Sequence, residues 1–146
     1  EQYPASFSYL LSQYSQQLNS DLSFLQYGAN GALRAELRAK EDSFALRVKL
    51  RHGWHINAAT PGDKRLIGAD VSGDHLSRIR YPDSTALNVQ FSQDAIEVYT
   101  GEFEIDGQQT TADGLLPPRL IFQFQACSDQ ICLPPERLVM QIPATH

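Results

Sequence analysis

The chain has 146 residues, of which 42% are hydrophobic and 20% are charged, a composition typical of one ordinary globular domain. Twelve basic against seventeen acidic residues give a net charge of −5, and no basic stripe is present that would bind nucleic acid. The two cysteines are too few for a disulfide-rich secreted scaffold.

Membrane insertion is also not expected, because no apolar run approaches the roughly 18 residues that cross a bilayer. The chain begins with Glu1 and has no methionine before Met140, which indicates a mature product or a piece of a longer polypeptide. Targeting information would then be missing from the sequence.

The N-terminal segment, residues 3–19, predicts one amphipathic helix. Its apolar residues recur at helical spacing, namely Phe7, Leu10, Leu11, Tyr14 and Leu18. Past residue 27 the apolar residues alternate instead with polar ones. We therefore expect residues 1–27 to be a helix and linker that end a preceding domain, and residues 28–146 to be a β domain.

Short runs with period-two alternation follow the helix, separated by turn residues. These runs cover residues 33–37, 44–50, 54–57, 66–72, 76–81, 95–106, 118–127 and 137–143. Many short strands between turns predict an all-β sandwich or barrel. We expect two packed antiparallel sheets whose inward-facing side chains include Phe44, Leu46, Val48, Leu50, Phe122 and Phe124.

Residues 83–94 form the longest stretch with weak periodicity, and loops of this length are often functional. Leu87, Val89 and Phe91 supply apolar side chains within this polar stretch. We expect the loop to cover the cysteines as a cap, with Asp83 and Phe91 as candidate binding residues.

Cys127 and Cys132 end a four-residue segment between two predicted strands. In a β-hairpin they would face each other across its base, where opposite Cα atoms are close enough for a disulfide. Cys127 continues the polar register of Gln123 and Gln125, so we expect the pair to lie near the surface, within reach of a partner thiol.

Several roles for these cysteines remain open. The pair is either a redox-active disulfide, a structural clip or two free thiols. As a clip it would be poorly placed, because closing so short a loop removes only about 2 kcal/mol of unfolded-state entropy. A zinc site lacks further ligands at paired spacing, and no motif for a hydrolase, a nucleotide enzyme or another cofactor is present.

Four other residues are candidates for the site, namely Trp54, His55, Tyr99 and Asp129. Trp54 is expected to pack at the core or its rim, and His55 either tunes a thiolate or forms ordinary surface hydrogen bonds. Asp129, between the cysteines, either disfavours a thiolate or simply forms a turn. In the rival function, a non-catalytic sandwich that binds a protein or glycan, Trp54, Tyr81 and Tyr99 would form an exposed aromatic platform.

The segment from Ala126 to Glu136, ACSDQICLPPE, resembles the active-site segment of the N-terminal periplasmic domain of the transmembrane reductase DsbD. Its Cys-Leu-Pro-Pro-Glu ending is the specific part. Residues 53–57 (GWHIN) and 98–101 (VYTG) are similar to two further motifs of this family, and the resemblance covers roughly residues 30–143. Four residues separate the cysteines, where the best-known member has five.

This resemblance implies an immunoglobulin-like fold in the periplasm, with electrons passing between thioredoxin-fold partners. It also implies that Cys132 bonds to partners and that Cys127 resolves the mixed disulfide. Residues 3–19 are weakly similar to the last helix of helical-barrel proteins with an N-terminal thioredoxin-like domain. On that resemblance the chain would be the C-terminal part of such a protein.

Overall fold

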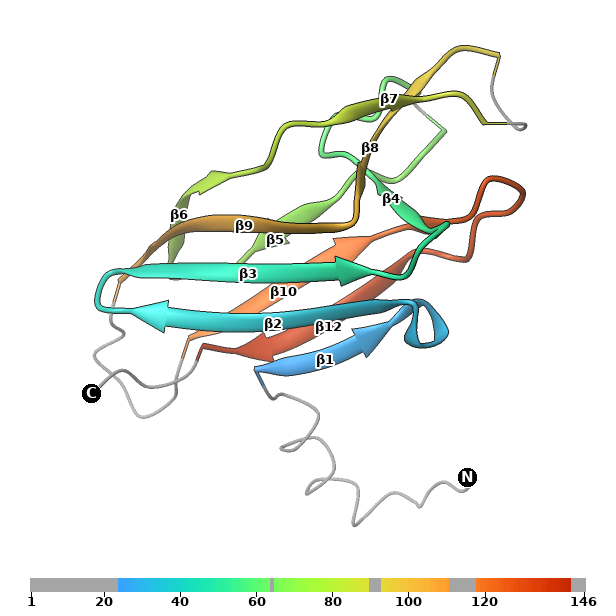
Figure 1. Cartoon of the computed structure of the whole chain (residues 1–146). Helices are drawn as coiled ribbons and strands as arrows, with labels where there is room; N and C mark the ends of the chain where they lie inside the picture. Colours follow the sequence, from blue (N-terminus) through green and yellow to red (C-terminus); the bar gives the residue numbers. More distant parts are fainter. Residues whose placement is uncertain (1–23, 64, 90–92, 111–117, 143–146) are drawn as a thin grey trace.

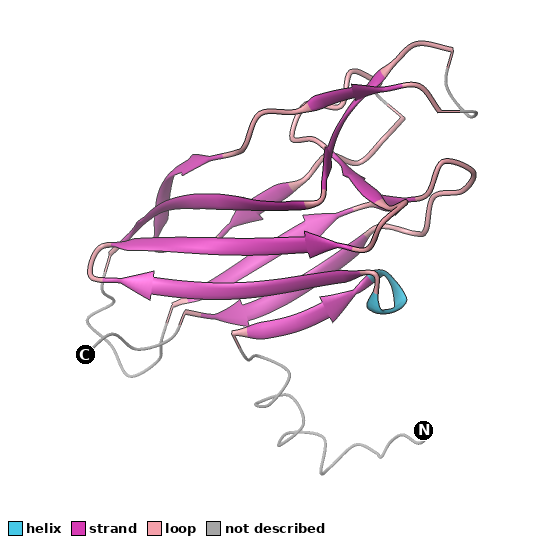
Figure 2. Cartoon of the chain, in the orientation of Figure 1, coloured by secondary structure: helices cyan, strands magenta, loops and turns pink. Residues whose placement is uncertain are grey.

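The computed structural model describes residues 24–63, 65–89, 93–110 and 118–142, and these residues form an all-β protein (Figure 1). Strands make up nearly all of its regular structure, and the one helical element described is a 3-10 turn, Ala29–Gly31 (Figure 2). All strand pairs in this part of the chain are antiparallel.

The strands form three sheets. The largest has the order β1 (Leu25–Gly28), β2 (Leu33–Lys40), β3 (Ser43–Leu50), β9 (Glu102–Gln109), β6 (Leu76–Arg80). The second has the order β12 (Glu136–Gln141), β10 (Arg119–Phe124), β5 (Asp70–Ser72). The third, which we call the small sheet, has the order β11 (Ala126–Cys127), β4 (His55–Asn57), β8 (Ile96–Thr100), β7 (Thr85–Leu87).

The first two sheets face each other and enclose the main hydrophobic core. In β2 and β3 alternate side chains are buried, as the period of a strand with one wet face requires. Buried residues of β10, β12 and β5 meet them from the second sheet. All six predicted core residues are at most 5% exposed, which confirms that part of the sequence analysis: Phe44, Leu46, Val48, Leu50, Phe122 and Phe124.

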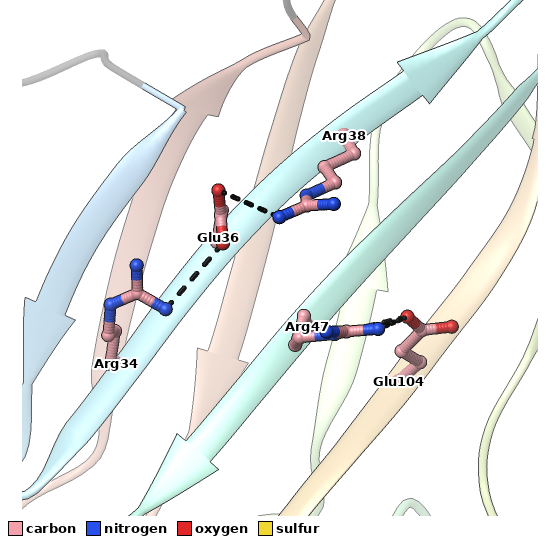
Figure 3. A network of polar contacts seen from close by, with 5 residues as sticks. All are labelled: Arg34, Glu36, Arg38, Arg47 and Glu104. Carbon is pink, nitrogen blue, oxygen red and sulfur yellow. Dashed lines mark hydrogen bonds and ion pairs between the residues drawn. The ribbon is translucent and has the colours of Figure 1, made fainter.

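The outer face of the largest sheet carries charged side chains in rows (Figure 3). The Glu36 carboxylate lies 3.5 Å from both Arg34 and Arg38 on its own strand. On the neighbouring strands, Arg47 pairs with Glu104 at 2.8 Å. Exposed pairs of this kind add little to the stability of a fold, so this face contributes mainly polarity.

The Glu136 carboxylate ties the first turn to the last strand. Its two oxygens accept hydrogen bonds from the Ala29 N–H at 2.9 and 3.2 Å. Beside this bond Gly28 lies against the Phe124 ring, where an added Cβ would come within 2.6 Å of the ring. The glutamate that ends the Cys-Leu-Pro-Pro-Glu segment therefore has a structural contact.

Two predicted strands are each divided in the structure. Residues 95–106 form β8 and β9, which separate at Gly101, whose φ of 69° favours glycine. Residues 118–127 form β10 and β11, which separate at Gln125. At both points the chain leaves one sheet and enters another, so three sheets form where two were predicted.

Two further predictions concern the N-terminal segment and residues 83–94. The helix predicted over residues 3–19 lies outside the described residues, and the first strand begins at Leu25. The segment predicted as a loop over residues 83–94 contains β7. Within the described ranges, no helix has the length and apolar character needed to cross a membrane.

Candidate functional site

Cys127 and Cys132 form a disulfide across a tight turn. Their Cα atoms are 4.0 Å apart, and they are paired as an antiparallel bridge. Hydrogen bonds flank the pair on both sides, from Ser128 N–H to the Ile131 carbonyl and from Leu133 N–H to the Ala126 carbonyl, each 2.8 Å long. The predicted pairing across a hairpin base is therefore confirmed.

The two sulfur-bearing residues differ in exposure. Cys127 is 0% exposed, whereas Cys132 is half-buried. The prediction that both lie near the surface is wrong for Cys127. The prediction failed because β10 ends before Gln125. Beyond Gln125 the chain pairs with β4 in the small sheet, so the alternation of exposed and buried residues along β10 does not extend to Cys127.

A cross-strand row connects the disulfide to His55. On the small sheet Thr100 is directly opposite His55, His55 is opposite Cys127, and Cys127 is opposite Cys132. Residues directly opposite each other project from the same face, with Cβ atoms about 4.5–5.5 Å apart. The imidazole and the disulfide therefore share one face of the sheet.

His55 is buried, with 3% of its surface exposed, so the surface position considered from the sequence is wrong. No group among the described residues forms a hydrogen bond with its Nε2 atom. Burial lowers the pKa of His55 below its ordinary value of 6.5, and the negative charge of Asp129 opposes that shift. The exposed Asp129 carboxylate thus acts electrostatically on His55.

A pocket of about 310 Å³ lies beside Cys132. Its walls come from the turn between the cysteines, the end of β10 and the segment after β4, and they comprise Asp63, Arg65, Leu66, Gln125, Gln130 and Cys132. Asp63 and Arg65 pair at 2.8 Å, and this contact lowers the pKa of Asp63 to about 2. The wall therefore carries an ion pair at neutral pH next to the half-buried cysteine.

The segments of residues 58–63 and 65–69, which we call the site loop, are held against the small sheet by side-chain hydrogen bonds of Gln125 and Asn57. The Gln125 side-chain oxygen accepts hydrogen bonds from the Asn57 amide at 3.1 Å and from the Ile67 N–H at 3.2 Å. The Asn57 amide also donates to the Ile67 carbonyl at 3.1 Å. Gln125 in turn donates to the carbonyl of Leu133, at 3.4 Å, just after Cys132.

The ends of the site loop are also fixed. The Ala69 N–H donates to the Ala58 carbonyl at 3.3 Å, and the Tyr99 hydroxyl accepts from the Ala59 N–H at 3.2 Å. Residues 66–69 of this loop were wrongly predicted as part of a strand over residues 66–72, because β5 begins only at Asp70. The one available signal was Pro61-Gly62-Asp63, which is typical of a turn.

The predicted aromatic platform does not form. Tyr99 is 4% exposed and packs in the main core, while Trp54 and Tyr81 are partly buried against it. Tyr81 uses its hydroxyl to accept a hydrogen bond from the Val71 N–H at 2.9 Å. The expectation that Trp54 packs at the core rim is confirmed.

The predicted cap is described only in part. Asp83 is exposed just before β7, at the edge of the small sheet opposite β11. Leu87 and Val89 form a second apolar cluster with Leu66 of the site loop, so they approach the pocket through that residue. Phe91 lies outside the described residues, and its role as a cap remains a prediction.

The described ranges contain no group of three histidine, cysteine or acidic side chains arranged to hold a metal ion.

Comparisons with known proteins give consistent findings. The sequence profile of the family described as thiol:disulfide interchange protein DsbD, N-terminal, matches residues 23–143. The fold is similar to that of the reduced DsbD N-terminal domain from Neisseria meningitidis, with 19% identity and a TM-score of 0.64, covering 82% of this chain and 90% of that one. Curated protein sequences give no match.

Two further solved structures share the fold. One is the complex between the DsbD and PilB N-terminal domains of Neisseria meningitidis, at 19% identity and a TM-score of 0.60, covering 86% of this chain and 92% of that one. The other is the N-terminal periplasmic domain of ScsB from Proteus mirabilis, at 16% identity and a TM-score of 0.58, covering 81% of this chain and 50% of that one.

Proposed function

Because the chain belongs to the family of DsbD N-terminal domains, we propose that it passes electrons between thioredoxin-fold proteins by thiol:disulfide exchange at Cys127 and Cys132. One observation carries the proposal: the disulfide joins a fully buried cysteine to a half-buried one beside a pocket. Such a bond offers a partner one sulfur and protects the other.

The exchange has two steps. A thiolate of the reduced partner attacks Cys132 Sγ, which forms a mixed disulfide and releases Cys127 as a thiolate that is then protonated. The second thiolate of the partner then attacks the partner's own sulfur in the mixed disulfide and releases Cys132. The partner is now oxidised, and the Cys127–Cys132 dithiol carries two electrons to the next acceptor.

Cys132 is assigned as the sulfur that bonds to partners, and Cys127 as the resolving one. Exposure supports the assignment, since a protein thiolate can approach Cys132 but not Cys127. Pro134 and Pro135 support it as well, because they have no N–H to pair with a neighbouring strand and so leave space after Cys132.

Two exposed apolar side chains could contact a partner that docks at Cys132. Ile131, next to Cys132, is 57% exposed, and Ile67 of the site loop is 37% exposed. Exposed apolar side chains beside a reactive group are typical of a protein contact. The meningococcal complex is consistent with a protein partner for this family, and the disulfide favours an extracytoplasmic, oxidising compartment such as the periplasm.

The rival function, a non-catalytic binding domain with a structural clip, has less support. The cysteines are only five residues apart in sequence, and so short a bridge stabilises a fold by about 2 kcal/mol in the chain-entropy model. The aromatic platform on which that function depended does not form, because Tyr99 is buried and Trp54 and Tyr81 pack partly against the core.

Trapping of a mixed disulfide tests the proposal. Each variant, Cys127→Ser or Cys132→Ser, is mixed with a thioredoxin that lacks its second cysteine and carries a thionitrobenzoate leaving group on the first, and the products are separated by non-reducing electrophoresis. We expect Cys127→Ser to form a lasting adduct through Cys132 and Cys132→Ser to form none. Adducts through Cys127 alone would reverse the roles, and adducts with neither variant would favour the structural clip.

An Ile131→Ser variant of the intact pair provides the matched control. It removes exposed apolar surface without touching either sulfur. We expect its exchange with thioredoxin to slow while its reduction by dithiothreitol keeps the wild-type rate, because the small thiol needs no docking surface.

A further inference from the structure

We propose that His55 is the proton acceptor that activates Cys127 when Cys127 resolves a mixed disulfide at Cys132. The inference rests on the proposed function, which it deepens by adding a residue to the cysteine pair. Three observations carry it: the cross-strand row, the burial of both residues, and the unpartnered ring nitrogen.

The row provides proximity. His55 is opposite Cys127 on β4 and β11, and Cys127 is opposite Cys132, so imidazole, resolving sulfur and partner-bonding sulfur follow one another across three adjacent segments. Their side chains project from one face, and opposite Cβ atoms lie about 4.5–5.5 Å apart. An imidazole at that separation can reach the neighbouring thiol.

Burial creates the need for a base. Cys127 is 0% exposed, and a buried site disfavours a thiolate, yet only the thiolate attacks a disulfide. Water cannot easily take the proton from such a group. A neutral imidazole can, and the depressed pKa of His55 keeps it neutral at physiological pH.

The Nε2 atom supplies the acceptor. In a residue that is 3% exposed, a ring nitrogen without a hydrogen-bond partner among the described groups is unusual and costs free energy. Asp129 is the charged group that acts on His55, and its negative charge stabilises the imidazolium that forms. A thiol beside a general base is the arrangement found in other activated cysteines.

Resolution of the mixed disulfide combines a proton transfer with a thiol:disulfide exchange. The Cys127 thiol gives its proton to His55, and its sulfur attacks Cys132 Sγ of the mixed disulfide. The Cys127–Cys132 bond forms, the bond from Cys132 to the partner sulfur breaks, and the partner leaves as a thiolate. Over formation and resolution of the mixed disulfide together, the chain loses two electrons and the partner gains two, and the imidazolium returns its proton to solvent.

Oxidised glutathione tests the inference without any protein partner. The reduced chain reacts with it to give a glutathione adduct at Cys132, and acid-quenched mass spectrometry follows the decay of that adduct as Cys127 resolves it. In the wild type the decay rate should rise with pH through a pKa below about 6.5. In His55→Gln it should fall about 100-fold at neutral pH, the lower end of general-base effects, and rise only through the thiol pKa.

His52→Gln is the matched control, because His52 is exposed and should leave the profile unchanged. Asp129→Asn provides a second test if His55→Gln does not fold. Because the Asp129 charge raises the pKa of His55, its removal should slow the decay of the adduct and move the inflection of the rate profile to lower pH. Wild-type rates and profiles in both variants would overturn the inference. If thioredoxin fails to react while glutathione resolution depends on His55, the proposed function fails and the inference stands.

Discussion

Replacing Gln125 with Ala should loosen the site loop and the segment after Cys132 together. The side chain makes three hydrogen bonds, to Asn57, Ile67 and Leu133, at 3.1, 3.2 and 3.4 Å. With about 1 kcal/mol for each bond, and less for the longest, the free energy of unfolding should fall by about 2–3 kcal/mol. Urea unfolding of the oxidised protein measures this loss.

The same variant should be reduced faster by dithiothreitol, because Gln125 forms part of the pocket wall beside Cys132. Gln123→Ala is the control: it makes the same chemical change two residues earlier on β10 and should cost less than about 1 kcal/mol. Equal stability losses in the two variants, or an unchanged reduction rate in Gln125→Ala, would refute the reasoning.

Three further predictions concern stability, each measured by urea unfolding. Phe122→Ala should cost about 3–5 kcal/mol, because the ring is fully buried between the two main sheets; a loss below about 1 kcal/mol would contradict that packing. Glu136→Ala should cost about 1.5–3 kcal/mol through the charged hydrogen bond to Ala29, and Glu136→Gln less. The folded-state pKa of His55 is depressed, so the folded state binds its proton less readily than the unfolded state. The stability contributed by neutral His55 is therefore present above about pH 6.5 and is lost as the pH falls through the folded-state pKa. His55→Gln should lack that part of the pH dependence of the free energy of unfolding.

The main sheets could be predicted because each of their strands has one buried and one wet face. Phe44, Leu46, Val48 and Leu50 alternate strictly, and burial follows that alternation. The alternation of apolar and polar residues is lost in strands that are covered on both faces. In β4 and β11 every residue is buried, so no alternation marks the position of the small sheet.

The cysteine pairing could also be predicted, because a short hairpin brings its two ends together whatever surrounds it. The burial of Cys127 could not, since it depends on the chain changing sheets at Gln125. The contacts of Gln125 with Ile67 and with Asn57 span 58 and 68 residues, and a local pattern carries no information about such contacts.

The reduction potential of the Cys127–Cys132 pair tests the central claim most directly. The oxidised chain is equilibrated with glutathione buffers of known potential, and the fraction of free thiol is determined by alkylation and mass spectrometry. An exchange module should give a value near about −200 mV, where thioredoxin-fold oxidoreductases can both donate and accept electrons. A value below about −300 mV would mark an inert structural bond and contradict the account.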